Sequence, residues 1–181
     1  MRDRQAGFTL VEVMVTVAVI SILIAVTVPS FFNETRKARA AAEVQPLFND
    51  LRVRLEQYLQ ENGVYPDTLG EAALYPTDTP TSAAMPLNPL PAAWQALKVR
   101  ISGPDQVRCG YSWVTSRSNS GQTGPTAGNA GPEATAFGFS PPATDWYYLL
   151  AKCRMDDGHS AFSWYFTSSV DPTIQKLNEG Q

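Results

Sequence analysis

The chain has 181 residues, of which 14 are Lys or Arg and 17 are Asp or Glu, so its formal net charge is −3. This length suffices for one domain plus a long helix, and the sequence contains neither a second domain nor an internal repeat. The acidic balance does not favour nucleic acid as a partner, and we expect Arg36, Lys37 and Arg39 to be solvated helix charges or contacts to other chains.

Residues 8–33 form the most apolar segment of the chain. No side chain between Glu12 and Glu34 carries a formal charge, and a bilayer core requires about 20 apolar residues to be crossed. A cleavable secretory signal would have a shorter apolar core. The segment is therefore expected to be a membrane-spanning helix.

The helix is expected to continue through residues 34–62 as an amphipathic segment. Asn62-Gly63 is a typical helix end, and Pro46 is expected to kink the helix because it removes a backbone hydrogen bond. We favour packing of the apolar stripe against the chain's own body over a coiled coil with another chain. The stripe consists of residues spaced by three and four: Val44, Phe48, Leu51, Leu55 and Tyr58.

A globular head is expected over residues 63–181. Its first part, residues 63–97, is rich in proline and predicts a linking meander with one short helical turn at 69–74. The second part, residues 98–181, predicts an antiparallel sheet with a surface loop at 116–134. The expected strands are 97–102 and 107–115, joined by the turn "GPDQ", then 135–140, 146–155 and 160–169.

In the last expected strand, aromatic side chains alternate with smaller ones. Phe162, Trp164 and Phe166 are expected on one face of the sheet, and Ala161, Ser163 and Tyr165 on the other. The concentration of aromatic residues here predicts a core on the sheet.

The N-terminus carries a specific resemblance. "MRDRQAG" followed by "FTLVEVMVTVAVISILIAVTVP" resembles the class III signal of type IV prepilins and type II secretion pseudopilins: a charged leader ending in Gly, then Phe-Thr-Leu, then Glu, then an apolar helix. The resemblance covers about the first 35 residues and implies a leader of residues 1–7. It implies that a prepilin peptidase cleaves between Gly7 and Phe8 and methylates the new N-terminus at Phe8.

Two further positions bear on this resemblance. Pro29 sits where many pilins carry a proline, which implies a helix kink there. Ser21 stands where many members have a glycine that loosens the helix in the filament, so the resemblance does not decide whether the helix melts near Ser21.

The resemblance implies an α+β pilin fold, in which a long N-terminal α-helix with a membrane-spanning first half packs against a C-terminal antiparallel β-sheet. It implies a structural subunit, not an enzyme, without cofactor or metal. The partners would be further copies in a helical homopolymer, the prepilin peptidase and an inner-membrane assembly platform. The precursor would lie in the inner membrane and the mature chain in an extracellular filament.

Two functions follow from this resemblance. One is a type IV pilus subunit that serves adhesion, twitching motility or DNA uptake, and the tail, residues 146–181, is similar in layout to those of deltaproteobacterial pilins. The other is a pseudopilin of a type II secretion system, in which "NGVYPDTLGEAAL" would match the "YP" stretch that follows the helix in many major pseudopilins. We favour the pilus subunit.

Glu12 is the one charged residue of residues 8–33. A carboxylate inside lipid costs roughly 2.5 to 3.5 kcal/mol at the centre of a span, so it is expected to have a partner. Cleavage would turn the Phe8 nitrogen into an amine that is largely protonated at neutral pH, and Glu12 of one subunit would face this amine of its neighbour. Alternatively, Glu12 stabilises only the positive end of its own helix dipole. The motif favours the assembly role.

Cys109 and Cys153 are the two cysteines of the chain. The exported head that the resemblance implies favours a disulfide between them, which the chain-entropy model values at about 4 kcal/mol. Two reduced, buried cysteines are the alternative. A zinc site is not expected, because His159 is the one histidine.

The segment "MDDGH", residues 155–159, invites a calcium site at Asp156 and Asp157. No spaced array of acids follows it, so a tight hairpin turn is favoured. The sequence also has no G-x-S-x-G nucleophile motif and no nucleotide-binding loop.

Overall fold

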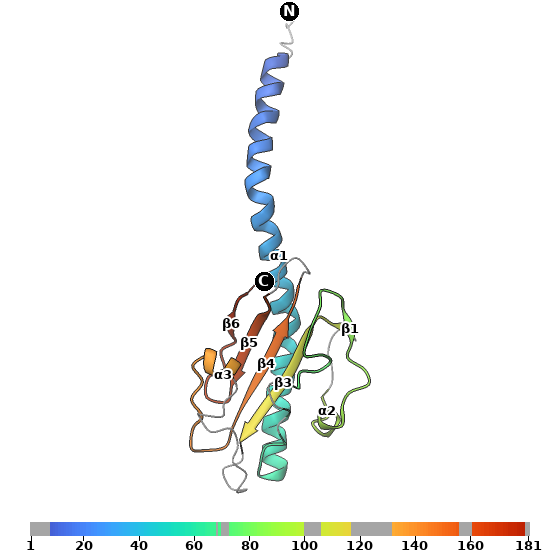
Figure 1. The fold of residues 1–181 in the computed structure, drawn as a ribbon, viewed down its shortest axis with the longest axis vertical. Helices are drawn as coiled ribbons and strands as arrows, with labels where there is room; N and C mark the ends of the chain where they lie inside the picture. The colour runs from blue at the N-terminus through green and yellow to red at the C-terminus, as the bar shows by residue number, and fades with distance from the viewer. Residues whose placement is uncertain are drawn as a thin grey trace, which may run out of the picture. The chain divides into compact units, whose positions relative to one another are not determined.

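The computed structural model describes residues 8–67, 69, 73–99, 106–116, 132–155 and 161–179. The chain divides into two compact units, Met1–Arg36 and Lys37–Gln181. Helix α1, Leu10–Asn62, contributes residues to both units (Figure 1).

The first unit contains the apolar part of α1. Leu10–Val28 is a run of 19 residues with a mean hydropathy of 2.6 and no buried side chain, which by length and composition could cross a membrane. The hydroxyls of Thr16, Ser21 and Thr27 donate to main-chain carbonyls three or four residues earlier. These bonds satisfy the hydroxyl protons without water, as a helix in lipid requires.

In the second unit, the later part of α1 packs against the head through one stripe. Four residues of the predicted stripe are fully buried: Val44, Phe48, Leu51 and Leu55. Tyr58, the fifth residue of the stripe, is partly buried and packs against the same core. The prediction that this stripe packs against the chain's own body is confirmed. The helix ends at Asn62, and Asn62-Gly63 is the helix end that the sequence predicted. Gly63 ends the helix with a positive φ of 74°, and its N–H donates to the carbonyl of Leu59.

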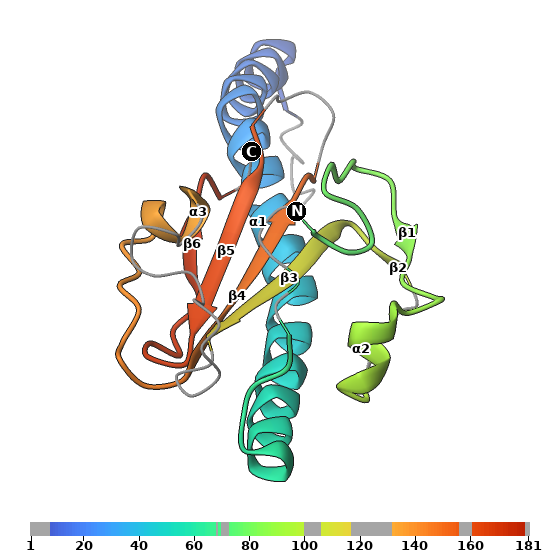
Figure 2. The same ribbon diagram turned by 60° about the horizontal axis from the view of Figure 1, so that its bottom comes forward.

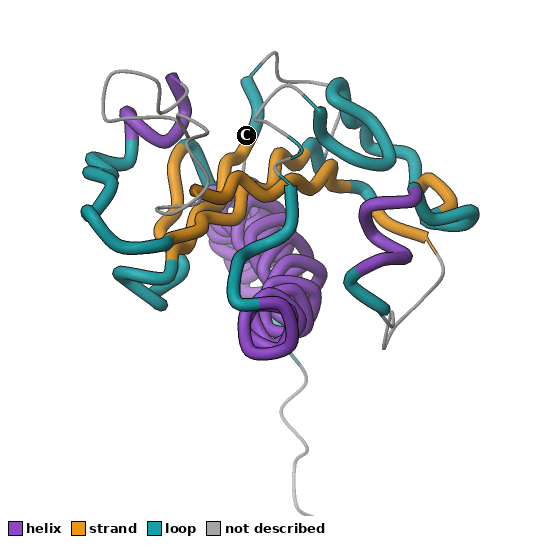
Figure 3. The backbone as a smooth tube through the Cα atoms, turned by 90° about the horizontal axis from the view of Figure 1, so that it is seen from below, coloured by secondary structure: helices purple, strands orange, loops and turns teal. Residues whose placement is uncertain are grey.

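The head is built on one antiparallel sheet. Its strands, in spatial order, are β3 (Cys109–Ser116), β4 (Trp146–Cys153), β5 (Ser163–Ser168) and β6 (Gln175–Leu177). Figures 2 and 3 show the sheet as a single layer with the later part of α1, after Arg36, against one of its faces. A long N-terminal helix packed with a C-terminal antiparallel sheet is the α+β arrangement that the sequence predicted.

The two faces of the sheet carry different cores. Tyr111 and Tyr165 belong to the cluster that packs against α1. On the opposite face, Phe166 packs with Phe137 and Phe139, with ring centroids 5.1 Å and 5.6 Å apart. The predicted separation of Tyr165 from Phe166 on opposite faces is therefore confirmed.

Two short strands and two short helices complete the described part of the head. Strand β1 (Met85–Pro86) pairs with β2 (Gln106–Val107) in a separate two-stranded sheet. Helix α2 (Ala92–Ala96) places Trp94 in the core, fully buried, with its ring 5.5 Å from that of Trp113. Helix α3 is Pro132–Ala136.

The strand predicted at 97–102 is wrong over the residues that the structure describes. Leu97 and Lys98 form the turn that ends α2, and the N–H groups of Leu97 and Val99 donate to carbonyls of that helix. Leu97 and Val99 are both buried, so a helix end produced the alternation that resembled a strand. Residues 100–102 lie outside the described part of the chain.

The strand predicted at 135–140 is also wrong. The segment begins in α3 and continues as a turn at Phe137 and Gly138. Gly138 has a positive φ of 70°, which ends the helix and lets both neighbouring phenylalanines reach the sheet. Phe137 and Phe139 are two residues apart, as alternate residues on one face of a strand would be, but they flank the turn residue Gly138.

Several predicted features lie partly or wholly outside the described residues. Residues 70–72 of the expected helical turn, residues 103–105 of the "GPDQ" turn and most of the loop at 116–134 lie outside them. The whole "DDGH" turn also lies outside them.

Strand β6 was not predicted from the sequence.

Gly110 on β3 has a close neighbour that excludes a side chain. A Cβ at this position would overlap the carbonyl oxygen of Thr77 and lie 3.1 Å from the Cβ of Leu74. The segment that contains Leu74 and Thr77 is fixed beside β3, because Tyr75 and Tyr111 exchange two main-chain hydrogen bonds of 2.8 Å. The main chain at Thr77 therefore has little room to move away from a new Cβ on residue 110.

Gly110→Ala is expected to lower the free energy of unfolding by about 3 kcal/mol, at the upper end of the cost of overpacking. Thermal unfolding of the full chain in detergent micelles measures this. The control is Gly138→Ala, where no atom lies within 4 Å of a new Cβ and only the positive φ is strained, at a cost of about 1 kcal/mol. Equal losses for the two variants would show that the Thr77 contact yields easily.

Candidate functional site

Glu12 lies in the first turn of α1 and is bound by Thr9. The Thr9 N–H and the Thr9 hydroxyl both donate to Glu12 Oε2 at 2.9 Å, and the Glu12 N–H donates to Thr9 Oγ1 at 3.2 Å. This reciprocal arrangement is a capping box, with Thr9 as the N-cap residue. It satisfies two N–H groups that a helix N-terminus otherwise leaves without partners.

The capping box shows that Glu12 has a partner within its own chain. Its carboxylate lies at the positive end of the helix dipole, where a negative charge is stabilising. The predicted contact with the Phe8 amine requires a second chain and stays a prediction. The sequence motif Thr-x-x-Glu was the available signal for the cap, and sequence reasoning missed it.

The surface around Glu12 is apolar and open. Phe8 is 88% exposed, and every side chain that the structure describes from Phe8 to Val28 is exposed. Such a continuous apolar surface is rare on a soluble monomer and marks contact with a membrane or with other chains.

The remaining predicted positions of the helix fall as follows. Gly7 lies outside the described residues. The helix α1 continues through both Pro29 and Pro46, and the kinks expected there stay predictions. At Ser21 the helix is continuous, and the hydroxyl is bonded to the Val17 carbonyl at 2.7 Å.

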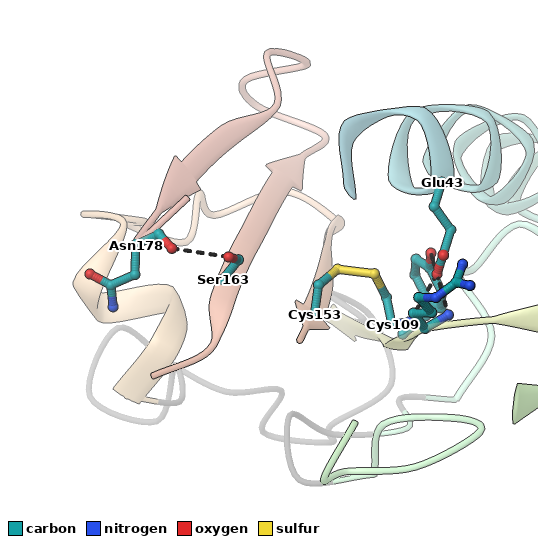
Figure 4. The surroundings of a disulfide bond; sticks show 7 residues. Glu43, Cys109, Cys153, Ser163 and Asn178 are labelled. Carbon is teal, nitrogen blue, oxygen red and sulfur yellow. Dashed lines mark hydrogen bonds between the residues drawn. A yellow bond between two sulfur atoms is a disulfide. The ribbon is translucent and has the colours of Figure 1, made fainter. Parts of the chain in front are cut away.

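Cys109 and Cys153 form a disulfide. They are directly opposite each other in the register of β3 and β4, and both are fully buried. The bond therefore joins two neighbouring strands inside the core beneath α1 (Figure 4).

Glu43 of α1 binds the same end of β3. Its Oε1 accepts hydrogen bonds from the main-chain N–H of Arg108 at 2.8 Å, from that of Cys109 at 2.8 Å and from the Tyr111 hydroxyl at 3.1 Å. Burial raises the pKa of Tyr111 well above its ordinary value, and the Glu43 carboxylate adds to the rise, so the phenol keeps its proton and donates. These contacts join residues 65 to 68 positions apart in the chain and were not predicted from the sequence.

The described residues hold no group of three or more His, Cys, Asp or Glu side chains that could bind a metal ion. Asp156, Asp157 and His159 lie outside the described part of the chain. The arrangement that the structure does present is an apolar helix with one capped carboxylate, joined to a disulfide-bonded head.

Comparisons with known proteins find a matching family model and several similar proteins. Residues 2–28 match the family model described as the prokaryotic N-terminal methylation motif. The chain is 34% identical over 83 residues to type II secretion system core protein G of Dickeya chrysanthemi, covering 44% of this chain and 54% of that protein.

Two further relatives are each 39% identical over 61 residues, which is 34% of this chain. They are type IV major fimbrial protein FimA of Dichelobacter nodosus, of which 38% is covered, and prepilin peptidase-dependent protein D of Escherichia coli strain K12, of which 41% is covered. The chain thus matches about half or less of the length of these relatives. No solved structure matches the chain.

Proposed function

We propose that this chain, which belongs to the type IV pilin and pseudopilin family, is a structural subunit of a type IV pilus that polymerises through its N-terminal helix. The observation that carries the proposal is the open apolar run Leu10–Val28, which begins inside a matched methylation motif at residues 2–28. A surface of this size needs a membrane before assembly and other subunits after it.

Processing is the first step of the proposed function. A prepilin peptidase cleaves between Gly7 and Phe8 while the helix lies in the inner membrane, and Phe8 is then methylated. Cleavage creates a positive charge at Phe8, which is highly exposed, close in sequence to the carboxylate of Glu12.

Assembly is the second step. Both hydrogen bonds that Thr9 donates go to Glu12 Oε2. Oε1 is therefore the oxygen that would accept a hydrogen bond from the Phe8 amine of a neighbouring subunit. The capping box fixes the direction of the carboxylate before the neighbour arrives. A preorganised acceptor loses less side-chain entropy on binding, and the inner-membrane assembly platform would bring the subunits together.

The head then forms the outer part of the filament. Its sheet packs on α1 through a fully buried stripe and is joined by the Cys109–Cys153 disulfide, as befits a domain exposed outside the cell. Adhesion, twitching motility or DNA uptake would be functions of the filament as a whole. We assign the chain no enzymatic activity of its own.

A pseudopilin is the second candidate function. It is favoured by the similarity to type II secretion system core protein G, which extends over 83 residues, against 61 for the fimbrial relative FimA. The neighbouring genes discriminate between the two, because a retraction motor indicates a pilus and a secretion operon indicates a pseudopilus.

Mechanical shearing of whole cells tests the proposal directly. A pilus subunit is expected mainly in the sheared surface fraction, within filaments that electron microscopy detects. A pseudopilin is expected in the cell envelope, with none in that fraction at natural expression. Recovery of the chain only as a soluble, unassembled protein would contradict both functions.

A further inference from the structure

The start of strand β3 is held from two sides at one residue, Cys109. Its main-chain N–H donates to Glu43 of α1 at 2.8 Å, and its sulfur is bonded to that of Cys153 on β4. Figure 4 shows Glu43 reaching from the helix toward Cys109 on the side away from Cys153. The hydrogen bond to Glu43 and the disulfide to Cys153 therefore both restrain the position of Cys109.

We propose that Glu43 is a positioning residue for the disulfide: it holds the start of β3 where Cys109 faces Cys153, so that the thiol–disulfide equilibrium of the pair depends on the Glu43 carboxylate. In the exchange, the two thiols transfer two electrons and two protons to a small disulfide oxidant. The sulfur–sulfur bond forms in the protein, and the oxidant leaves as two thiols.

The strength of the Glu43 contact supports this role. One carboxylate oxygen accepts from two successive main-chain N–H groups and from a buried phenol. Hydrogen bonds to an ionised acceptor are about twice as strong as neutral ones. The main-chain N–H of Cys109 belongs to a fully buried residue, where the loss of a hydrogen-bond partner is costly, so the start of β3 has one strongly preferred position against α1.

Linkage makes the coupling reciprocal. If the Glu43 contacts favour the arrangement that the disulfide needs, the disulfide strengthens those contacts by the same factor. Reduction is therefore expected to loosen the hold of Glu43 on β3, and removal of the Glu43 charge is expected to favour the two thiols.

Burial gives the same contact a kinetic effect. Cys109 and Cys153 are both fully buried, so a reductant reaches the bond only after local opening of this end of the sheet. Separating β3 from α1 breaks all three bonds to Glu43. The rate of reduction is therefore also expected to depend on Glu43.

The experiment uses the full chain in detergent micelles, equilibrated with mixtures of reduced and oxidised glutathione. Alkylation of free thiols and intact mass give the oxidised fraction at each ratio. Glu43→Gln, which keeps the size of the side chain and removes its charge, is expected to lower the equilibrium constant for disulfide formation about tenfold. Its reduction by glutathione is expected to be faster than that of the wild type.

Two variants separate positioning from general destabilisation. Tyr111→Phe removes one of the three donors and keeps the ring, so a smaller shift of about threefold in the same direction is expected. Thr115→Val is the control on the far end of β3, where the hydroxyl donates to the Pro66 carbonyl at 2.6 Å. It is expected to lower the melting temperature and to leave the equilibrium with glutathione unchanged.

The comparison has two outcomes. A shift in Glu43→Gln and Tyr111→Phe but not in Thr115→Val supports the proposal, and Tyr111→Phe alone decides if the Glu43 variant does not fold. Wild-type equilibria in the Glu43 and Tyr111 variants, or an equal shift in Thr115→Val, would overturn it.

Discussion

Glu12→Gln is expected to reduce the yield of filaments at least about tenfold, since removing one partner of a buried charge pair costs several kcal/mol. Glutamine retains the size of the side chain and can form the same capping box with Thr9, so the substitution removes the charge alone. Insertion into the membrane is expected to be unharmed, because an amide costs less than a carboxylate in lipid. Cleavage at Gly7 is expected to continue, and mature subunits accumulate in the inner membrane.

Thr9→Val is the matched control, because it removes the hydroxyl of the capping box and keeps the carboxylate of Glu12. If the charge pair with Phe8 of a neighbour drives assembly, Thr9→Val forms filaments and Glu12→Gln does not. If the cap is the sole role of Glu12, Glu12→Gln forms filaments at wild-type yield, and Thr9→Val, which keeps only the main-chain bond of residue 9 to Glu12, forms fewer. Immunoblots of sheared filaments and of membranes measure both variants, and wild-type filament yield from Glu12→Gln alone would eliminate the charge pair.

Gly7→Val is expected to abolish maturation. The peptidase must accommodate a small residue beside the scissile bond, and a β-branched side chain obstructs this position. The unprocessed chain is then expected in the inner membrane, still carrying residues 1–7, and intact mass distinguishes it from the mature chain. Filaments are expected to be absent, because the Phe8 nitrogen stays an uncharged amide.

Ala6→Val places the same branched side chain one residue farther from the bond and serves as the control for Gly7→Val. It is expected to mature, with cleavage still after Gly7. Normal maturation of Gly7→Val would refute cleavage at this position and with it the interpretation of residues 1–7 as a leader.

The helix and the central strands could be predicted because their signals are local. The spacing of Val44, Phe48, Leu51 and Leu55 matches the helical repeat, and all four are buried. Strand β4 is a nearly continuous run of apolar and aromatic residues, and β5 contains three aromatic residues in succession; most residues of both strands are buried, as in a sheet covered on both faces. Local sequence patterns were sufficient for these elements.

The errors and omissions have a common physical origin in contacts between distant segments. Helices α2 and α3 have five residues each and are too short to show a period. They are stabilised by Trp94 against Trp113 and by Phe137 against Phe166. The β6 strand has three residues and depends on pairing with β5.

The candidate sites show the same division. The Thr9–Glu12 cap could have been recognised as a motif, because its residues are three positions apart, but it was missed. The Glu43 contacts were not, because they join residues 65 to 68 positions apart in the chain. A carboxylate on a helix face looks like a solvated charge until the fold brings β3 beside it.

The mass of the N-terminal peptide of the chain, recovered from sheared filaments, tests the central claim most directly. A subunit that is cleaved, methylated and polymerised through its helix is expected to yield a peptide that begins at Phe8 and carries one methyl group on its nitrogen. Filaments in which the chain still begins with residues 1–7, or assembled filaments that lack the chain altogether, would contradict this account.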